Sequence, residues 1–217
     1  DASYVRRINQ WLAEGIDLDA DGQFTERSTT VYNPICDRAF VVMAVKLKRP
    51  ELLAPVRANL EAMLYLLHSD FEVVTEISRR QDQNVRGTMS GYWFPLRYLA
   101  IHDANGRFAA VANRYNDTAA GLSMLMEYPE LLGTLPPLVP PPDRYTREMN
   151  ALGIVRFRRG AESSTLLAGQ PVFFATRAGG AVIEGVRFAS AFFGKGQFTA
   201  PAIEKQGDRY LLRQQIG

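Results

Sequence analysis

The stretch "LPPLVPPPD", Leu135–Asp143, divides the sequence into two parts with different periodicities. Its prolines fix the backbone and remove hydrogen-bond donors, so we expect an extended, semi-rigid connection there. Before the stretch, apolar residues recur with the helical period, and after it they alternate with polar residues as in strands. The sequence therefore predicts a helical part over 1–134, a proline-rich linker over 135–143 and an antiparallel β part over 144–217.

The helical part is expected to consist of several amphipathic helices. Helical patterns cover Tyr4–Glu14, Asn33–Leu47, Pro50–Asp70, Gly91–His102 and Arg107–Tyr128. In the second of these, Asn33 stands at the N-cap position and Pro34 at the first helical position, where its missing N–H costs nothing. The segment "FEVVTEISRRQD", 71–82, breaks the helical period and favours an extended segment or a short hairpin.

The β part shows alternating segments that are separated by glycines, such as "GIVRFRRG", 153–160, and "AVIEGVRFASAFFG", 181–194. The alternation in "RFRRG" predicts that its basic side chains lie on the outer face of a strand. Helices followed by antiparallel strands indicate an α+β protein whose two kinds of structure are segregated along the chain.

The composition is that of an ordinary globular protein, with 47% hydrophobic and 22% charged residues in a chain of 217. A formal net charge of +2 does not favour nucleic acid as a partner. No apolar run approaches the roughly 20 residues that a membrane-spanning helix needs. We therefore expect neither a nucleic-acid nor a membrane partner.

The sequence has one cysteine, Cys36, so an intrachain disulfide is excluded. Cys36 lies within an apolar helical run and is interpreted as a buried, inert thiol. A single cysteine is compatible with the cytosol and with many bacterial periplasmic proteins. Of the possible locations, a periplasmic or secreted one is favoured.

The segment "DLDADG", 17–22, has the first ligand positions and the glycine of an EF-hand calcium loop. The twelfth position of such a loop supplies a bidentate glutamate, and here it is Ser28. We therefore interpret the segment as a solvated acidic loop between helices and predict no metal site.

The longer segment "DGQFTERSTTVYN", 21–33, followed by an apolar helix, resembles a loop of the heparinase II/III-like polysaccharide lyases and their alginate-lyase relatives. The residues that carry the resemblance are Asp21, Gly22, Phe24, Glu26, Ser28 and Tyr32. The resemblance implies a partial (α/α) toroid of antiparallel helix pairs followed by an antiparallel β-sandwich-type region. It implies β-elimination on an acidic, uronate-containing polysaccharide or oligosaccharide, without a cofactor.

The chain also departs from that family. The family's carboxylate-neutralising asparagine, often next to a histidine, lies on toroid helices before the motif, and this chain begins too close to the motif to contain it. A histidine commonly contributed by the sandwich is also missing, because the β part of this sequence has none.

Elimination at a uronic acid requires a base for the C5 proton, an acid for the leaving oxygen and neutralisation of the sugar carboxylate. Tyr32 is the candidate base or acid, because a phenol both donates and accepts and a helix N-terminus favours the phenolate. The alternative is a tyrosine that packs as a hydrophobic staple. Asn33 is a candidate for neutralising the carboxylate, with helix capping as its alternative.

The segment "EISRRQDQN", 76–84, is a candidate substrate-binding loop. Arg79 and Arg80 offer planar guanidinium groups that suit carboxylates or sulfates, while Gln81 and Asp82 offer hydrogen bonds to sugar hydroxyls. The alternative is a solvated loop whose arginines pair with its own acidic residues.

Two further candidates come from the aromatic residues and histidines. Tyr92 and Trp93 could stack on a sugar ring, although such residues more often belong to a core. His102 is a weaker candidate base, and His68 suits the end of a helix. The spacing of the two histidines matches no zinc motif.

Three functional hypotheses follow. The first is a polysaccharide lyase that uses Tyr32 and binds the anion through Arg79 or Arg80. The second is a toroid glycoside hydrolase, which needs two opposed carboxylates. Its candidates are Asp21, Glu26, Glu72, Glu76 and Asp82. The third is a non-catalytic glycan-binding or structural protein.

Overall fold

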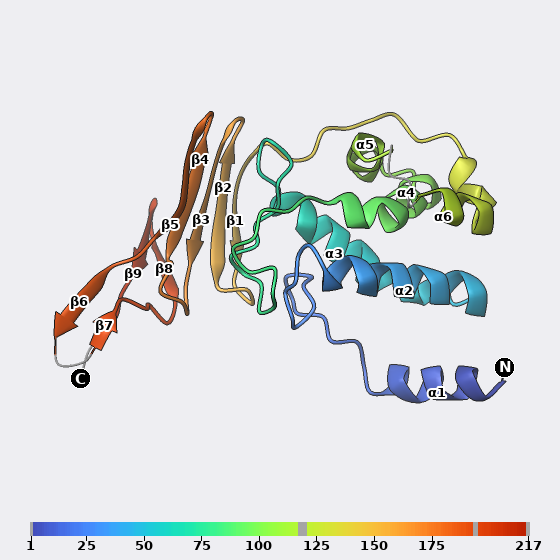
Figure 1. The fold of residues 1–217 in the computed structure, drawn as a ribbon, viewed down its shortest axis with the longest axis horizontal. Helices are drawn as coiled ribbons and strands as arrows, with labels where there is room; N and C mark the ends of the chain where they lie inside the picture. The colour runs from blue at the N-terminus through green and yellow to red at the C-terminus, as the bar shows by residue number, and fades with distance from the viewer. Residues whose placement is uncertain (1, 117–120, 193–194, 216–217) are drawn as a thin grey trace.

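The computed structural model describes residues 2–116, 121–192 and 195–215, and it has the predicted order of helices first and strands second (Figure 1). The helices are α1 (Ala2–Ala13), α2 (Tyr32–Leu47), α3 (Leu53–Tyr65), α4 (Trp93–His102), α5 (Gly106–Arg114) and α6 (Gly121–Glu127). Short 3-10 turns cover Pro50–Leu52, Ser90–Tyr92 and Pro129–Leu132. The chain is therefore an α+β protein.

The first five strands form one antiparallel sheet in the order β1-β2-β3-β4-β5. These strands are β1 (Arg144–Met149), β2 (Ile154–Arg159), β3 (Glu162–Leu167), β4 (Phe174–Ala178) and β5 (Ala181–Val186). Two separate two-stranded antiparallel sheets follow. One is made of β6 (Ala189–Phe192) and β7 (Lys195–Gln197), and the other of β8 (Ile203–Gln206) and β9 (Arg209–Leu212).

Helices α2, α3 and α4 pack on one another, and one end of each faces the sheet (Figure 1). Their apolar stripes form the main core, which continues into the sheet through Met149, Leu152, Ile154 and Leu167. Helix α1 has no buried residue and lies beside α2 (Figure 1). Among the described residues, no helix is long and apolar enough to cross a bilayer.

The linker is extended, as its prolines predict, and it packs against the start of α5. Val139 N–H donates to the carbonyl oxygen of Gly106 at 3.0 Å. A Cβ atom on Gly106 would lie 2.4 Å from the carbonyl oxygen of Pro137, so this close approach requires glycine. The linker is thus held against the helices although it has no regular structure of its own.

Two buried arginines join the sheet to the helices, and here the prediction of an outward-facing basic strand is wrong. Arg156 is fully buried and donates to the carbonyl oxygens of Tyr65 and Leu67, each at 3.2 Å. Arg158 donates to the same Leu67 carbonyl at 3.1 Å. Carbonyls at the C-terminal end of a helix such as α3 lack helical partners and carry partial negative charge, so they attract cations.

Three boundaries differ from the sequence predictions. Helix α2 begins at Tyr32, so Asn33 lies in its first turn instead of capping it, and the Ser28 hydroxyl accepts from the Tyr32 N–H at 3.1 Å. The helix predicted over Arg107–Tyr128 is interrupted, with part of the prediction, 117–120, outside the described residues. The segment 71–82 is an irregular loop, with isolated bridges only at its start.

Candidate functional site

The acidic loop before α2 is a tight turn that is fixed against α3. The Asp19 carboxylate accepts from the backbone N–H groups of Asp21 and Gln23, each at 2.9 Å. Gly22 has φ +82°, and a Cβ atom there would lie 2.5 Å from the carbonyl oxygen of Ala58. Because no side chain fits at this position, glycine allows the turn to lie directly on α3.

Protein donors also engage the other carboxylates of this loop. Thr25 donates its hydroxyl to the Asp17 carboxylate, and the Leu152 N–H donates to Asp21 at 3.0 Å. Within the described part of the chain, no group of three or more metal-ligating side chains comes together. The loop therefore uses its acidic residues to fix its own shape and to reach the sheet.

Asp82 ties this segment to the following loop. Its buried carboxylate accepts from Ser28 Oγ at 3.0 Å, from Thr30 N and Oγ1 at 3.0 and 2.8 Å, and from the Ser78 hydroxyl. Burial raises the pKa of Asp82, but the hydrogen bonds from Ser78, Thr30 and Ser28 outweigh it and hold the pKa below its ordinary value. Asp82 is thus a structural residue of the site and does not face a ligand.

Tyr32 lies next to the guanidinium group of Arg80. Arg80 Nη2 donates to the phenol oxygen at 3.4 Å, and its guanidinium carbon lies 5.0 Å from the centre of the ring. The hydrogen bonds from Arg80 and Gln81, and then the charge of Arg80, lower the pKa of Tyr32. Glu26 lies 3.6 Å from Arg80 Nη1 and completes the cluster. This setting stabilises the phenolate form of Tyr32 relative to that of an isolated tyrosine.

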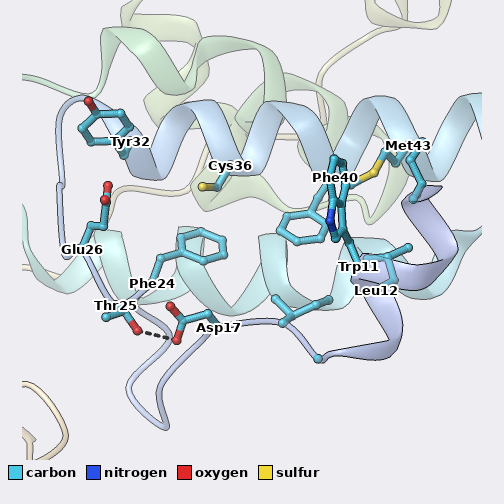
Figure 2. A pocket seen from close by; sticks show the side chains of 13 residues that line it. Trp11, Leu12, Asp17, Phe24, Thr25, Glu26, Tyr32, Cys36, Phe40 and Met43 are labelled. Carbon is cyan, nitrogen blue, oxygen red and sulfur yellow. Dashed lines mark hydrogen bonds between the residues drawn. The ribbon is translucent and has the colours of Figure 1, made fainter. Parts of the chain in front are cut away.

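A pocket of about 440 Å³ begins at Tyr32 and runs between α1, α2 and the acidic loop. Figure 2 shows Tyr32 and Glu26 near one end, and Trp11 and Phe40 near the other. Cys36 lines the middle of this pocket and is only half buried, so the expectation of a buried thiol is wrong. Burial still raises the pKa of Cys36, with Asp37 as the next cause. The pocket thus joins an apolar wall to a polar end formed by Glu26 and Tyr32.

Arg79, the neighbour of Arg80 in sequence, lies at a different pocket of the protein. Its backbone N–H donates to the Glu26 carbonyl at 3.0 Å, and its Nη1 donates to the Thr25 carbonyl at 3.3 Å. It lines a second, polar pocket of about 370 Å³ together with Arg27. The two adjacent arginines therefore serve two separate surfaces.

Burial removes three of the predicted residues from any ligand surface. Tyr92 is 0% and Trp93 5% exposed, and the Tyr92 hydroxyl donates to the Thr29 carbonyl at 2.6 Å. Neither ring has a face open to a sugar, so the two residues belong to the core. Asn33 is also fully buried and donates Nδ2 to Gln23 Oε1 at 2.6 Å, so it does not reach a sugar carboxylate.

The histidines lie away from Tyr32. His102 is exposed at the end of α4, where Nδ1 lies 2.7 Å from the Asp103 carboxylate, and it lines a separate pocket with Ile101 and Leu131. His68 is buried with Nδ1 2.7 Å from Ser163 Oγ. Burial, and then nearby arginines, lower the pKa of His68 to about 2. The structure thus brings together Tyr32, Arg80 and Gln81 of the predicted site residues.

From the sequence, Arg27 was missed as a ligand-facing candidate, and Glu26 was considered only as a carboxylate of a glycoside hydrolase. Glu26 and Arg27 stand side by side within the loop that carries the family resemblance, and each lines one of the two pockets. A charged pair placed between the turn at Gly22 and the helix start at Tyr32 was the available signal. Comparison of the chain with models of protein families, with curated proteins and with solved structures finds no match.

Proposed function

We propose that the chain belongs to a carbohydrate-active protein that cleaves an acidic, uronate-containing glycan by β-elimination. One observation carries the proposal: the phenol oxygen of the partly exposed Tyr32 accepts a hydrogen bond from Arg80 and faces solvent beside a pocket. A phenol with a lowered pKa and a neighbouring cation is the pair that proton abstraction beside a carboxylate requires.

In the proposed reaction, the Tyr32 phenolate takes the C5 proton of the uronate. The electron pair of the broken C–H bond forms the C4–C5 double bond, and the C4–O bond to the leaving sugar breaks. The leaving oxygen takes a proton from the phenol that has just formed or from water, so the step needs no further reactant. Arg80 stabilises both the phenolate and the charge that develops on the sugar carboxylate.

The finer description of the fold belongs to the same proposal. We regard the packed helices α2, α3 and α4 as part of an (α/α) toroid, and the antiparallel strands as the start of a β-sandwich. Support comes from the order of helices before strands and from the position of Tyr32 at the helix ends that face the sheet (Figure 1). Under this description the substrate would lie at the end of α2 that carries Tyr32.

The structure gives little support to a glycoside hydrolase. Asp82 and Asp21 accept hydrogen bonds from the protein, and Glu72 is paired with Arg86 and Arg177 at 2.6 Å each. These carboxylates are therefore engaged and do not form an open pair. Glycan binding without catalysis is the second candidate, and it is favoured by one observation: neither Asn33 nor His102 reaches Tyr32 to assist it.

The test is an ultraviolet assay for unsaturated uronate ends on alginate, heparan sulfate, chondroitin sulfate and hyaluronan. The Tyr32→Phe variant keeps the ring but loses the ionisable oxygen, so we expect its rate to fall by at least about 100-fold. Tyr4→Phe, on the exposed face of α1, is the matched control and should retain the wild-type rate. No product from any of the four glycans, or equal rates for Tyr32→Phe and wild type, would overturn the lyase proposal.

A further inference from the structure

The second pocket, of about 370 Å³, lies where the helical part meets the sheet. Its walls come from the loop before α2, from the 76–83 loop and from the turns that follow β1 and β3. Its polar lining residues are Arg27, Glu76, Ser78, Arg79, Gln83, Asn150 and Gln170. We call it the junction pocket. It is a polar hollow with two cations, separate from the apolar pocket beside Tyr32.

Arg27 is held rigidly at this place. Its φ of +50° lies in the left-handed region, which non-glycine residues rarely adopt, so the fold maintains it at an energetic cost. Nη1 donates to the Leu152 carbonyl at 3.1 Å and Nη2 to the Ala151 carbonyl at 2.6 Å. These bonds fix the guanidinium group at the turn between β1 and β2.

Arg79 contributes the second cation. Within the described part of the chain, no ion pair joins its guanidinium group to a carboxylate, whereas Arg80 lies near Glu26. Of the described residues that line the junction pocket, only Glu76 is acidic, and its carboxylate accepts from the Thr75 N–H at 2.9 Å. Burial, and then the charge of Arg79, lower the pKa of Arg27. The charges of Asp19 and Asp21 act in the opposite direction on Arg27, but neither residue lines the junction pocket. The two guanidinium groups therefore repel each other across this pocket.

We propose that the junction pocket binds the carboxylate or sulfate of an acidic sugar unit, between Arg27 and Arg79. Planar guanidinium groups bind both kinds of oxyanion through paired N–H donors, and a bound anion would relieve the repulsion. The amides of Gln83, Asn150 and Gln170 suit the sugar hydroxyls. The assignment to a glycan rests on the proposed function. Under this assignment, one acidic sugar unit of the glycan lies at Tyr32 and a second unit of the same glycan lies in the junction pocket.

Calorimetric titration tests this proposal in a Tyr32→Phe background, where the proposed turnover is blocked. The probes are an alginate tetrasaccharide with carboxylates, a heparan sulfate tetrasaccharide with carboxylates and sulfates, and neutral cellotetraose. Removing a charge-assisted contact by Arg79→Gln should weaken binding of an acidic probe roughly tenfold. Arg79→Lys should give an intermediate loss, and Arg38→Gln, an exposed arginine on α2, should give none.

The outcomes separate the pocket from the lyase proposal. A larger loss with the heparan probe would identify sulfate as the bound group, and equal losses would identify carboxylate. Unchanged affinity for Arg79→Gln in a chain whose wild type still cleaves would overturn the pocket and leave the lyase proposal standing. An affinity that falls with Arg79→Gln, with no elimination by the wild type, would support the pocket and remove the lyase. Failure of both acidic probes to bind, or equal binding of cellotetraose, would overturn the pocket.

Discussion

Arginines at two places in this molecule have opposite environments. At the junction of α3 and the sheet, Arg156 is fully buried and donates to two backbone carbonyls and to Thr165 Oγ1 at 2.6 Å. In the 76–83 loop, Arg79 and Arg80 are exposed and make one long hydrogen bond each from their side chains, at 3.3 and 3.4 Å. At the first place, acceptors within the protein use the N–H donors of the guanidinium group. At the second place, N–H donors remain available to a ligand.

This difference separates structural from functional charge. A guanidinium group has five N–H donors, and burial without partners is costly, so a buried arginine must find acceptors in the fold. Exposed arginines have no such requirement, and surface ion pairs stabilise a protein little. We therefore expect substitutions at Arg156 to change stability and substitutions at Arg79 or Arg80 to change ligand chemistry.

The largest stability effect should come from Arg156→Ala. The change leaves a cavity next to the end of α3 and takes donors away from Leu67 and Thr165, so we expect a loss of about 3 kcal/mol in the free energy of unfolding. Urea unfolding monitored by circular dichroism gives this value, with Arg38→Ala as the exposed control. If Arg80→Gln lowers the melting temperature as much as Arg156→Ala does, the distinction between the two places is wrong.

A smaller change in the free energy of unfolding is expected from His68, which lies at the same junction and affects stability in acid. The folded pKa of His68 is lowered from 6.5 to about 2, so below pH 6.5 the unfolded chain binds a proton that the folded chain does not. Stability should therefore fall as the pH drops below 6.5, by at most about 1.4 kcal/mol per pH unit. His68→Asn keeps a polar group for Ser163 without ionising, and its unfolding free energy should depend less on pH between 5 and 6.5. If the unfolding free energies of the wild type and of His68→Asn depend equally on pH over this range, the prediction is wrong.

The smallest effect is expected inside the helical part, at Asp37 on α2. Both carboxylate oxygens of this residue are buried without a hydrogen-bond partner within the described structure, and burial raises its pKa well above 3.8. The folded chain then keeps a proton that the unfolded chain releases. The contribution of Asp37 to the free energy of unfolding therefore decreases as the pH rises from 3.8 towards the folded pKa. Asp37→Asn should melt at a higher temperature than wild type at pH 7, with the gain shrinking towards pH 4. A gain of equal size at both pH values would show that ionisation is not its cause.

The sequence predicted the parts of the fold that depend on periodicity. The helices before Leu135, the extended proline-rich linker and the strands after Asp143 follow from local preferences of the backbone. A helix start close to Tyr32 was predicted from Asn33 and Pro34, although the observed helix already begins at Tyr32.

The direction in which individual polar side chains point could not be predicted from the sequence, because it depends on contacts between distant segments. Asn33 turns into the core because Gln23 offers it an acceptor there, and Arg156 faces inward because the carbonyls of α3 lie behind the strand. Alternation in a strand identifies two faces but not which one meets the helices. Asp82 is likewise drawn from a loop into the interior by hydroxyl donors far away in sequence, Ser28 and Thr30.

In the proposed mechanism, Arg80 prepares Tyr32 for proton transfer. The most direct test is a pH titration of tyrosine labelled with ¹³C at Cζ, followed by NMR, with the Tyr32 signal assigned from its absence in Tyr32→Phe. We expect Tyr32 to titrate below the ordinary tyrosine pKa of 10.0, and we expect its pKa to rise in Arg80→Gln. A Tyr32 pKa at or above 10.0, unchanged by the loss of Arg80, would contradict this mechanism.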